Sequence, residues 1–325
     1  MGLLVKGQWR DQWYDTEATG GEFVREDAQF RDWIVPPGAA APAGCRAWPV
    51  QAGRYHLYVS LACPWAHRTL IYRELKGLAD LIGVSVVSPL MLEQGWTFDR
   101  ASGSTGDPLY DSEFMHQIYT RCNPDYSGRV TVPVLWDRES QTIVNNESAD
   151  IIRMFNDAFD DLTGNDLDFY PADLQSHIDA LNARVYDTVN NGVYRAGFAT
   201  RQSAYDQAFE ALFDTLGQLD RDLSGQRYLT GERITEADWR LFTTLIRFDA
   251  VYHGHFKCDL RRIEDYPCLS GYLRDLYQQT GVASTVSIDH IQRHYYYSHD
   301  TINPTRIVPR GPVLDFDRPH GRGHL

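Results

Sequence analysis

Hydrophobic and polar positions in the first half of the chain alternate between strand-like runs and helical spacings. Residues 55–59 are rich in aromatic and β-branched side chains, as a short buried strand is. The next apolar positions, Leu70, Ile71 and Leu75, have helical spacing, and Gly77 is suited to end that helix. Further strands are expected at residues 82–88, 129–136 and 141–144, and helices at residues 112–121 and 149–156. The predicted order is strand, helix, strand, and later two strands and a helix.

The second half of the chain, residues 171–297, has helical periodicity. Two apolar stripes have the spacing of core-facing helix surfaces. They are Leu174, Ile178, Leu181, Val185 and Val189, and then Phe209, Leu212, Phe213, Leu216 and Leu219. Thr235 is predicted to cap a helix, with Asp238 as the acidic partner in a capping box. Residues 300–325 are rich in Pro and Gly and are predicted to be extended and irregular.

These patterns divide the chain into four parts. We expect an N-terminal arm at residues 1–50, an α/β domain at 51–160, an all-helical domain at 168–299 and an extended tail at 300–325. A chain of 325 residues with 43% hydrophobic content is long enough to bury two cores. The formal net charge of -13 argues against nucleic acid and against anionic membrane surfaces as partners.

The five cysteines form no close pair, and an odd number is a poor disulfide framework. The pattern favours a reducing compartment, and we expect a cytoplasmic protein because no signal-peptide or membrane-spanning pattern is present. Cys63 and His67 have the i,i+4 spacing of metal ligands, but no second ligand pair accompanies them, so we expect no metal.

Cys63 stands where the first strand gives way to the first helix. Pro64 suits the first helical position, where no backbone N–H is needed. A thiol at a helix N-terminus faces unpaired N–H groups and the positive end of the helix dipole, which lowers a cysteine pKa. The alternative is a buried, inert cysteine. The succession of strand, Cys-Pro and helix favours a reactive thiolate, and Ala66 stands where a dithiol oxidoreductase has its second cysteine.

Two further features suit the binding of an extended peptide with a carboxylate. Pro133 interrupts the strand at 129–136, which requires a sheet edge, a bulge or a cis peptide bond. A cis bond would expose the Val132 backbone for pairing, and the sequence leaves the isomer open. Glu147 and Ser148 stand at the start of a predicted helix, where N–H groups can hold a carboxylate. Ser148 could equally serve as the N-cap.

Motifs along nearly the whole chain point to one family. They are Ser-Leu-Ala-Cys-Pro-Trp-Ala-His around Cys63, Gly-Trp-Thr-Phe around Trp96, Val-Pro-Val-Leu-Trp-Asp, Asn-Glu-Ser-Ala, Asn-Asn-Gly-Val-Tyr-Arg-Ala-Gly-Phe-Ala, Arg-Phe-Asp, His-Tyr-Tyr and Thr-Ile-Asn-Pro. The sequence resembles the glutathionyl-hydroquinone reductases, the Xi-class branch of the glutathione transferases. The resemblance implies a thioredoxin-like N-terminal domain, an all-helical glutathione-transferase C-terminal domain and extended arms. It also implies that the tail packs on the globule.

The resemblance implies a covalent mechanism on glutathione carried by a hydroquinone through a thioether. The Cys63 thiolate would attack the glutathione sulfur and release the hydroquinone, and a second glutathione would resolve the Cys63–glutathione mixed disulfide. Glutathione is then a co-substrate, the other partner is the glutathionylated hydroquinone, and the family suggests a homodimer.

The resemblance also assigns site residues. Glutathione contacts fall on Trp96, Arg129, the Val130 backbone, Glu147 and Ser148. Pocket tyrosines that handle the hydroquinone hydroxyls match Tyr194, Tyr252 and Tyr295, with Tyr296 and Tyr297 as neighbours that one sequence cannot tell apart. Without the resemblance, each tyrosine fits half-buried packing equally well, and Arg129 fits a solvated surface charge.

Two other functions fit parts of the sequence. An omega-like thioltransferase or dehydroascorbate reductase would use the same thiolate and would lack the tyrosine cluster. A non-catalytic binding protein with this fold would not need an intact Cys63. A conjugating transferase is disfavoured, because it activates bound glutathione with Ser or Tyr and a cysteine there would form the mixed disulfide.

Overall fold

The computed structural model describes residues 2–325, and the chain folds into two compact units. Unit 1 comprises Met1–Trp13, Glu26–Leu167 and Thr285–Ser298, and unit 2 comprises Tyr14–Arg25, Asp168–Ser284 and His299–Leu325. Two stretches group differently from the domain limits expected from the sequence. Residues 14–25 of the arm join the helical unit, and residues 285–298 join the sheet unit.

The core of unit 1 is a sheet with the strand order β6-β5-β8-β9. Its strands are β5 (Tyr55–Val59), β6 (Gly83–Val86), β8 (Val134–Asp137) and β9 (Thr142–Asn145). β6 runs parallel to β5, whereas β8 is antiparallel to both β5 and β9. Every residue of β5 is buried, including Tyr58, whose hydroxyl donates to Asp107 at 3.1 Å. The predicted thioredoxin-like order of strands and helices is confirmed.

The strand predicted at residues 129–136 is two strands. β7 (Gly128–Arg129) ends before Val132, β8 begins at Val134, and the Val132–Pro133 peptide bond between them is cis. A proline has no N–H to donate to a strand ladder, so the run cannot continue as one strand.

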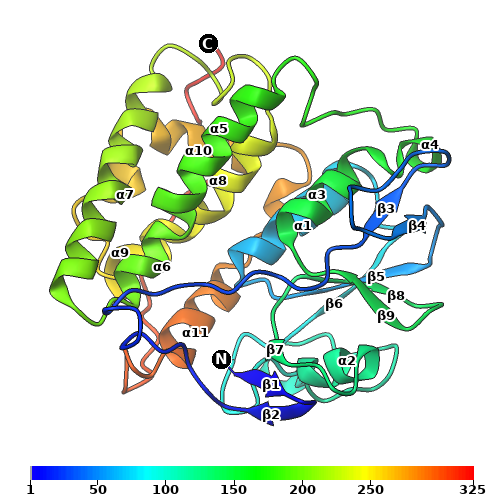
Figure 1. The fold of residues 1–325 in the computed structure, drawn as a ribbon. Helices are drawn as coiled ribbons and strands as arrows, with labels where there is room; N and C mark the ends of the chain where they lie inside the picture. Colours follow the sequence, from blue (N-terminus) through cyan, green and yellow to red (C-terminus); the bar gives the residue numbers. More distant parts are fainter. Residues whose placement is uncertain (1) are drawn as a thin grey trace. The chain divides into compact units, whose positions relative to one another are not determined.

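Helices α1 (Pro64–Leu75) and α3 (Ser148–Asp157) lie side by side in unit 1 (Figure 1). The other helical segments of this unit are η1 (Arg100–Ser102), α2 (Met115–Cys122), α4 (Asp160–Thr163) and α11 (Ile288–Ser298). α2 begins later than the sequence predicts, because the Gln117 side chain accepts hydrogen bonds from the N–H groups of Glu113 and Phe114 and so fixes the helix start.

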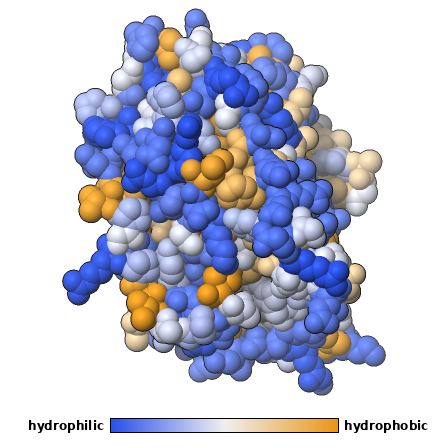
Figure 2. All heavy atoms as spheres, turned by 90° about the vertical axis from the view of Figure 1, so that its left-hand side faces the viewer, coloured by the Kyte–Doolittle hydropathy of each residue, from blue (hydrophilic) through white to orange (hydrophobic). Residues whose placement is uncertain are grey.

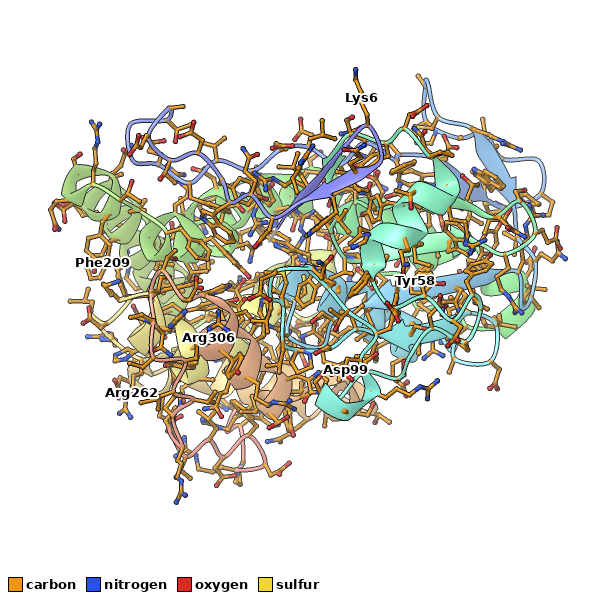
Figure 3. The ribbon with its side chains drawn as sticks, turned by 90° about the horizontal axis from the view of Figure 1, so that it is seen from below. Lys6, Tyr58, Asp99, Phe209, Arg262 and Arg306 are labelled. Atoms are coloured by element: carbon orange, nitrogen blue, oxygen red, sulfur yellow. The ribbon has the colours of Figure 1, made fainter. Side chains whose placement is uncertain are left out.

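The N-terminal arm contains strands that the sequence did not predict. β1 (Leu3–Val5) and β2 (Gln8–Arg10) form a hairpin, and β1 also pairs with β7. Lys6 projects from the turn of this hairpin (Figure 3). Farther along the arm, β3 (Trp33–Val35) and β4 (Ala47–Pro49) pair in parallel. Each of these strands is three residues long, which is below the length at which hydrophobic alternation is readable.

Unit 2 is built from helices. They are α5 (Gln175–Val185), η2 (Tyr186–Asn190), α6 (Gly192–Gly197), α7 (Gln202–Asp222), α8 (Glu236–Arg247), η3 (Phe248–Tyr252), α9 (His253–His255), η4 (Ile263–Asp265) and α10 (Leu269–Tyr277), with η5 (Val282–Thr285) at its boundary. Most positions of the predicted stripes face the core. Ile178, Val185 and Val189 and then Leu212, Phe213, Leu216 and Leu219 are buried, whereas Leu174, Leu181 and Phe209 are half-buried. The capping box of Thr235 and Asp238 at the start of α8 is confirmed.

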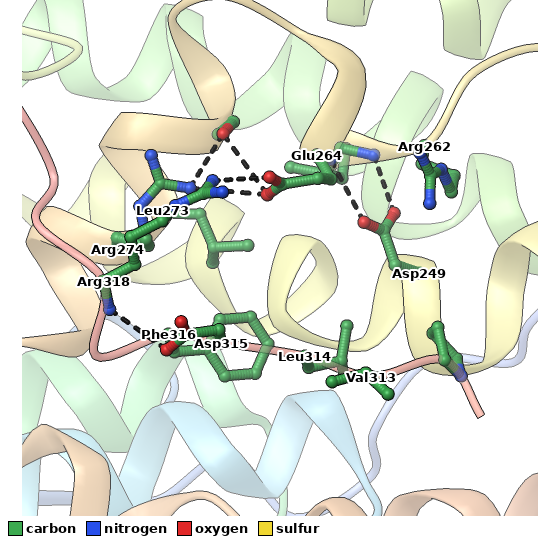
Figure 4. Close-up of a pocket in the computed structure, with 13 residues that line it drawn as sticks. Asp249, Arg262, Glu264, Leu273, Arg274, Val313, Leu314, Asp315, Phe316 and Arg318 are labelled. Atoms are coloured by element: carbon green, nitrogen blue, oxygen red, sulfur yellow. Dashed lines mark hydrogen bonds and ion pairs between the residues drawn. The ribbon is translucent and has the colours of Figure 1, made fainter. Parts of the chain in front are cut away.

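The tail packs on unit 2 as the resemblance implies. The Arg322 guanidinium is buried and donates to the carbonyl oxygens of Leu223, Gln226 and Arg227. A cavity of about 140 Å³ lies beside the tail. The Glu264 carboxylate in its lining pairs with Arg274 and Arg318 (Figure 4). The guanidinium charges in this cavity are therefore partly neutralised by the protein itself.

Hydrophilic side chains predominate on the face drawn in Figure 2, and hydrophobic ones form separated groups on it. Of the helices formed by residues 2–325, none combines the length and the apolar character needed to cross a membrane.

Candidate active site

Cys63 is the N-cap residue of α1, with Pro64 at the first helical position. Its backbone is extended (φ -77, ψ 122), and its N–H donates to the Ser60 carbonyl at 3.2 Å in the turn that follows β5. The side chain is half-buried and carries a thiol that is in no disulfide. The predicted change from strand to helix at Cys63 is confirmed, and it exposes the sulfur to the amide end of α1.

The sulfur of Cys63 lies 3.5 Å from the carbonyl oxygen of Val132, the residue before the cis proline. An S–H group donating to this oxygen favours the protonated thiol, whereas the helix N-terminus favours the thiolate. The ionisation of Cys63 expected from the sequence stays a prediction.

Glu147 and Ser148 begin α3. The Glu147 carboxylate accepts from the Ala149 N–H at 2.9 Å, so Glu147 is the N-cap and Ser148 is the first helical residue. The alternative that Ser148 caps the helix is therefore wrong. The Ser148 hydroxyl donates to the same carboxylate at 3.3 Å and accepts from the buried guanidinium of Arg68 at 3.4 Å. A cation, a hydroxyl and a carboxylate thus meet at one helix start.

Trp96 lies in the loop that follows β6, and its indole is buried. The ring stacks on the imidazole of His294 from α11, with centroids 4.8 Å apart. Nδ1 of His294 is 3.0 Å from the carbonyl oxygen of Pro89, so this nitrogen carries the proton of the neutral ring. Sequence reasoning missed His294 as a supporting residue, although the His-Tyr-Tyr motif that contains it was part of the family resemblance.

Arg129 is buried at the end of β7, where its guanidinium contacts the N-terminal arm. It donates to the carbonyl oxygens of Gln12 and Trp13 and lies 3.4 Å from the carboxylate of Glu26. Val130, the next residue, is also buried. The alternative that Arg129 is a solvated surface charge is wrong, because the side chain is buried. Its contact with a glutathione carboxylate stays a prediction.

The tyrosines of the run in α11 differ in burial. Tyr295 is buried and packs edge-on against His294, with ring centroids 5.2 Å apart, whereas Tyr296 and Tyr297 are half-buried. Burial raises the pKa of Tyr296. Tyr295 is therefore the ring of the run that is joined to the Trp96–His294 stack.

Tyr194 and Tyr252 lie together in unit 2, with ring centroids 5.9 Å apart. Both rings are buried and both contact Phe256, at 5.5 Å and 5.4 Å between centroids. The π-helical segment η3 ends at Tyr252, and Tyr194 lies in α6. The structure thus brings these two predicted tyrosines into one aromatic cluster.

The other predicted site residues belong to unit 1. They are Cys63, Trp96, Arg129, Val130, Glu147, Ser148, Tyr295 and Tyr296. Across residues 2–325, no group of three or more His, Cys, Asp or Glu side chains has an arrangement that could hold a metal ion. His67, the other half of the weak metal pattern, is buried and bonds Thr285 at 2.8 Å.

Two family models match the chain, and they define its class. "Glutathione S-transferase, N-terminal domain" matches residues 62–158, and "Glutathione S-transferase, C-terminal domain" matches residues 202–275. The order of the two domains is thus that of a glutathione transferase.

Similar proteins narrow the class. Glutathionyl-hydroquinone reductase YqjG of Escherichia coli K12 is 59% identical over 323 residues, which cover 99% of this chain and 98% of that protein. Its glutathione-bound structure has a TM-score of 0.91 and covers 99% of each chain. Glutathionyl-hydroquinone reductase PcpF of Sphingobium chlorophenolicum is 53% identical, covering 96% of this chain and 97% of that protein. A Xi-class transferase from Natrialba magadii has a TM-score of 0.90 at 49% identity, covering 100% of this chain and 97% of that one. The chain belongs to the glutathionyl-hydroquinone reductases, the Xi-class branch of the glutathione transferases.

Proposed function

We propose that this protein reduces glutathionyl-hydroquinones to hydroquinones at the expense of glutathione. The observation that carries the proposal is the thiol of Cys63 at the amide end of α1, beside the Val132 carbonyl, in a chain of this family. That position suits a sulfur nucleophile that must accept an extended peptide next to it.

In the first step the Cys63 thiolate attacks the sulfur that joins glutathione to the aromatic ring. A sulfur–sulfur bond forms and the bond from sulfur to the ring carbon breaks, so sulfur is oxidised and carbon is reduced. Aryl carbon is a poor leaving group. The ring carbon therefore first takes up a proton, which gives the keto tautomer. When the bond from carbon to sulfur then breaks, its electron pair enters the ring carbonyl and leaves a hydroquinone anion. A second proton transfer, to the oxygen of this anion, gives the hydroquinone.

In the second step a glutathione thiolate attacks the glutathionyl sulfur of the mixed disulfide. Glutathione disulfide forms and the Cys63 thiolate returns. One hydroquinone and one glutathione disulfide are produced for each glutathione consumed. The covalent intermediate separates the two half-reactions, which gives ping-pong kinetics.

Glutathione is held by residues of unit 1 in this proposal. Glu147 binds the γ-glutamyl ammonium and Ser148 its carboxylate, supported by the cation of Arg68 next to Ser148. Trp96 contacts the tripeptide from its stacked position on His294. The Val130 backbone pairs with the peptide. Arg129 binds a glutathione carboxylate, which replaces part of its hydrogen bonding to the N-terminal arm.

Tyrosines handle the hydroquinone and its protons. Tyr194 donates or accepts the proton in the release step, and Tyr252 beside it positions a hydroquinone hydroxyl. Tyr295 and Tyr296 contribute further contacts to the aromatic substrate. We also propose a cytoplasmic location, which fits five cysteines that form no disulfide in the described chain, and a homodimer, as the family suggests.

The proposal is tested by product stoichiometry. The protein is supplied with a glutathionyl-hydroquinone and glutathione, and hydroquinone and glutathione disulfide are separated and quantified. We expect equal amounts of both with the unaltered protein and only the uncatalysed background with Cys63→Ser. Reduction of small disulfides without any hydroquinone would instead identify an omega-like thioltransferase.

A further inference from the structure

Residues 14–25 of the N-terminal arm are anchored on unit 2. The Thr200 N–H donates to the Gly21 carbonyl at 3.0 Å, and the hydroxyls of Thr16 and Thr200 are 3.2 Å apart. Gly21 has φ +94, and a Cβ there would come within 2.6 Å of the Arg201 side chain. This approach needs a glycine both for its backbone conformation and for its close contact.

The segment ends with Arg25 against the face of Tyr194. The Arg25 guanidinium carbon lies 4.5 Å from the centroid of the Tyr194 ring. Its Nε–H donates to the Asn191 side chain at 3.0 Å, three residues before Tyr194. Phe23 is buried beside Tyr194 and packs on Phe198 with ring centroids 5.2 Å apart. The Tyr194 ring and the Asn191 side chain therefore both fix the Arg25 guanidinium. The packing of Phe23 on Phe198 fixes the segment that carries Arg25.

We propose that Arg25 is a positioning residue for Tyr194, holding a permanent positive charge over its ring so that the phenol transfers its proton more readily during hydroquinone release. The inference rests on the proposed function, because it gives Arg25 a task only if Tyr194 acts on a proton.

The physical basis is the attraction between a cation and an aromatic face. A guanidinium stays charged at every working pH, so its effect on Tyr194 is constant. The attraction is stronger for the phenolate, which carries a full negative charge, than for the phenol. Arg25 therefore lowers the free energy of the phenolate relative to the phenol. An acid whose pKa is closer to the working pH transfers its proton more effectively.

Several other titratable groups lie in the aromatic cluster of Tyr194 or next to it in unit 2. Tyr252 carries a phenol and no permanent charge, and the guanidinium of Arg195 is paired with the Asp187 carboxylate at 2.9 Å. His255 and His299 both stack on Phe256, with ring centroids 5.3 Å and 5.9 Å from it, and burial lowers the pKa of His255 to about 4, so it is neutral at pH 7. Tyr14 contacts Phe23 and is likewise a phenol.

The first test follows Tyr194 itself and needs no substrate. A 3-fluorotyrosine placed at position 194 reports its ionisation through its fluorine NMR shift. We expect Arg25→Gln to raise the midpoint by at least roughly 0.4 pH unit, and Arg25→Lys to raise it less. Arg46→Gln is the matched control, since Arg46 lies 4.0 Å over the ring of Trp48 in unit 1. A midpoint unchanged by Arg25→Gln, or moved equally by Arg46→Gln, overturns the inference.

The second test is a double-mutant cycle with Tyr194→Phe. We expect Arg25→Gln to slow hydroquinone release roughly threefold to tenfold, and to have no further effect once Tyr194 is Phe. Exchange of Cys63 with a small disulfide is expected to be unchanged by Arg25→Gln. The inference is contradicted if Arg25→Gln slows hydroquinone release by the same factor with Tyr194 and with Phe at position 194. It is also contradicted if Arg25→Gln slows disulfide exchange as much as it slows hydroquinone release. If the unaltered protein releases no hydroquinone, the proposed function fails, and the NMR titration still decides whether Arg25 acts on Tyr194.

Discussion

Trp96 and His294 stack with their ring centroids 4.8 Å apart and their planes inclined by 22°, joining the loop after β6 to helix α11. The Pro89 carbonyl fixes the imidazole through Nδ1, and Tyr295 packs on its edge. The loop holding Trp96 is long and otherwise has little regular structure. His294 therefore immobilises a ring that, in the proposed function, contacts glutathione.

Replacing His294 is expected to weaken glutathione binding more than it slows the chemical step. In His294→Ala the indole of Trp96 loses its stacking partner, worth about 0.5–1.5 kcal/mol beyond the lost area. We expect KM for glutathione to rise roughly twofold to tenfold with a smaller change in kcat. Steady-state kinetics with varied glutathione measure both values.

The control is Phe316→Ala, which removes a ring contact between Phe316 and Tyr277, with centroids 5.1 Å apart. That contact joins the C-terminal tail to α10 in unit 2, and its loss should leave KM unchanged. Equal KM values for the two variants would show that the Trp96 stack has no particular role in binding.

Glu147 has two tasks that one pair of variants can separate. Its carboxylate caps α3, and in the proposed function it also pairs with an ammonium. Glu147→Gln keeps an oxygen acceptor for the Ala149 N–H and removes the charge. Glu147→Ala removes both, and losing the cap costs about 0.5–2 kcal/mol.

We therefore expect a raised KM for glutathione in both variants, and a lowered melting temperature chiefly in Glu147→Ala. Thermal unfolding and steady-state kinetics measured on the same samples separate the effect on stability from the effect on glutathione binding. A normal KM in Glu147→Gln would restrict Glu147 to capping the helix.

His56 should make the stability of the protein depend on pH. It lies in β5, it is 4% exposed, and burial lowers its pKa to about 4, opposed in part by Asp107. Its pKa in the unfolded chain is near the ordinary 6.5, so the unfolded state binds the proton first as pH falls. The stabilisation from neutral His56 is thus present above about pH 6.5 and is lost as pH falls toward about pH 4, by up to about 3 kcal/mol.

Urea unfolding at several pH values measures this effect. We expect the free energy of unfolding to fall less steeply between pH 7 and pH 4 in His56→Gln than in the unaltered protein. His177→Gln, which changes an exposed histidine, is the control and should keep the original slope. If the free energy of unfolding depends on pH in the same way in His56→Gln and in the unaltered protein, His56 takes up its proton equally in the folded and the unfolded state.

Local signals made the structure around Cys63 predictable. The position of Cys63 follows from an aromatic strand, a proline that suits the first helical turn and a regular apolar spacing, all within about twenty residues. The capping box at Thr235 was readable for the same reason. The exact start of α3 was not, because Glu147 and Ser148 both have oxygen acceptors and only the hydrogen-bond geometry separates them.

Contacts between distant parts of the chain were not predictable from pattern. Nothing in the local sequence around Trp96 indicates that it stacks on His294, and nothing around Arg25 indicates that it lies over Tyr194. The short strands of the arm depend likewise on pairing with β7. Such features arise from tertiary packing, which a single sequence does not encode by residue spacing.

Mass spectrometry of the covalent intermediate shows whether the Cys63 thiolate takes glutathione from the aromatic ring. The protein is mixed with a glutathionyl-hydroquinone in the absence of free glutathione and is then digested. We predict one glutathione on the peptide that contains Cys63, with an equal amount of hydroquinone released, and no adduct in Cys63→Ser. Release of hydroquinone by the unaltered protein with no adduct, or with the adduct on another cysteine such as Cys122, would contradict this account.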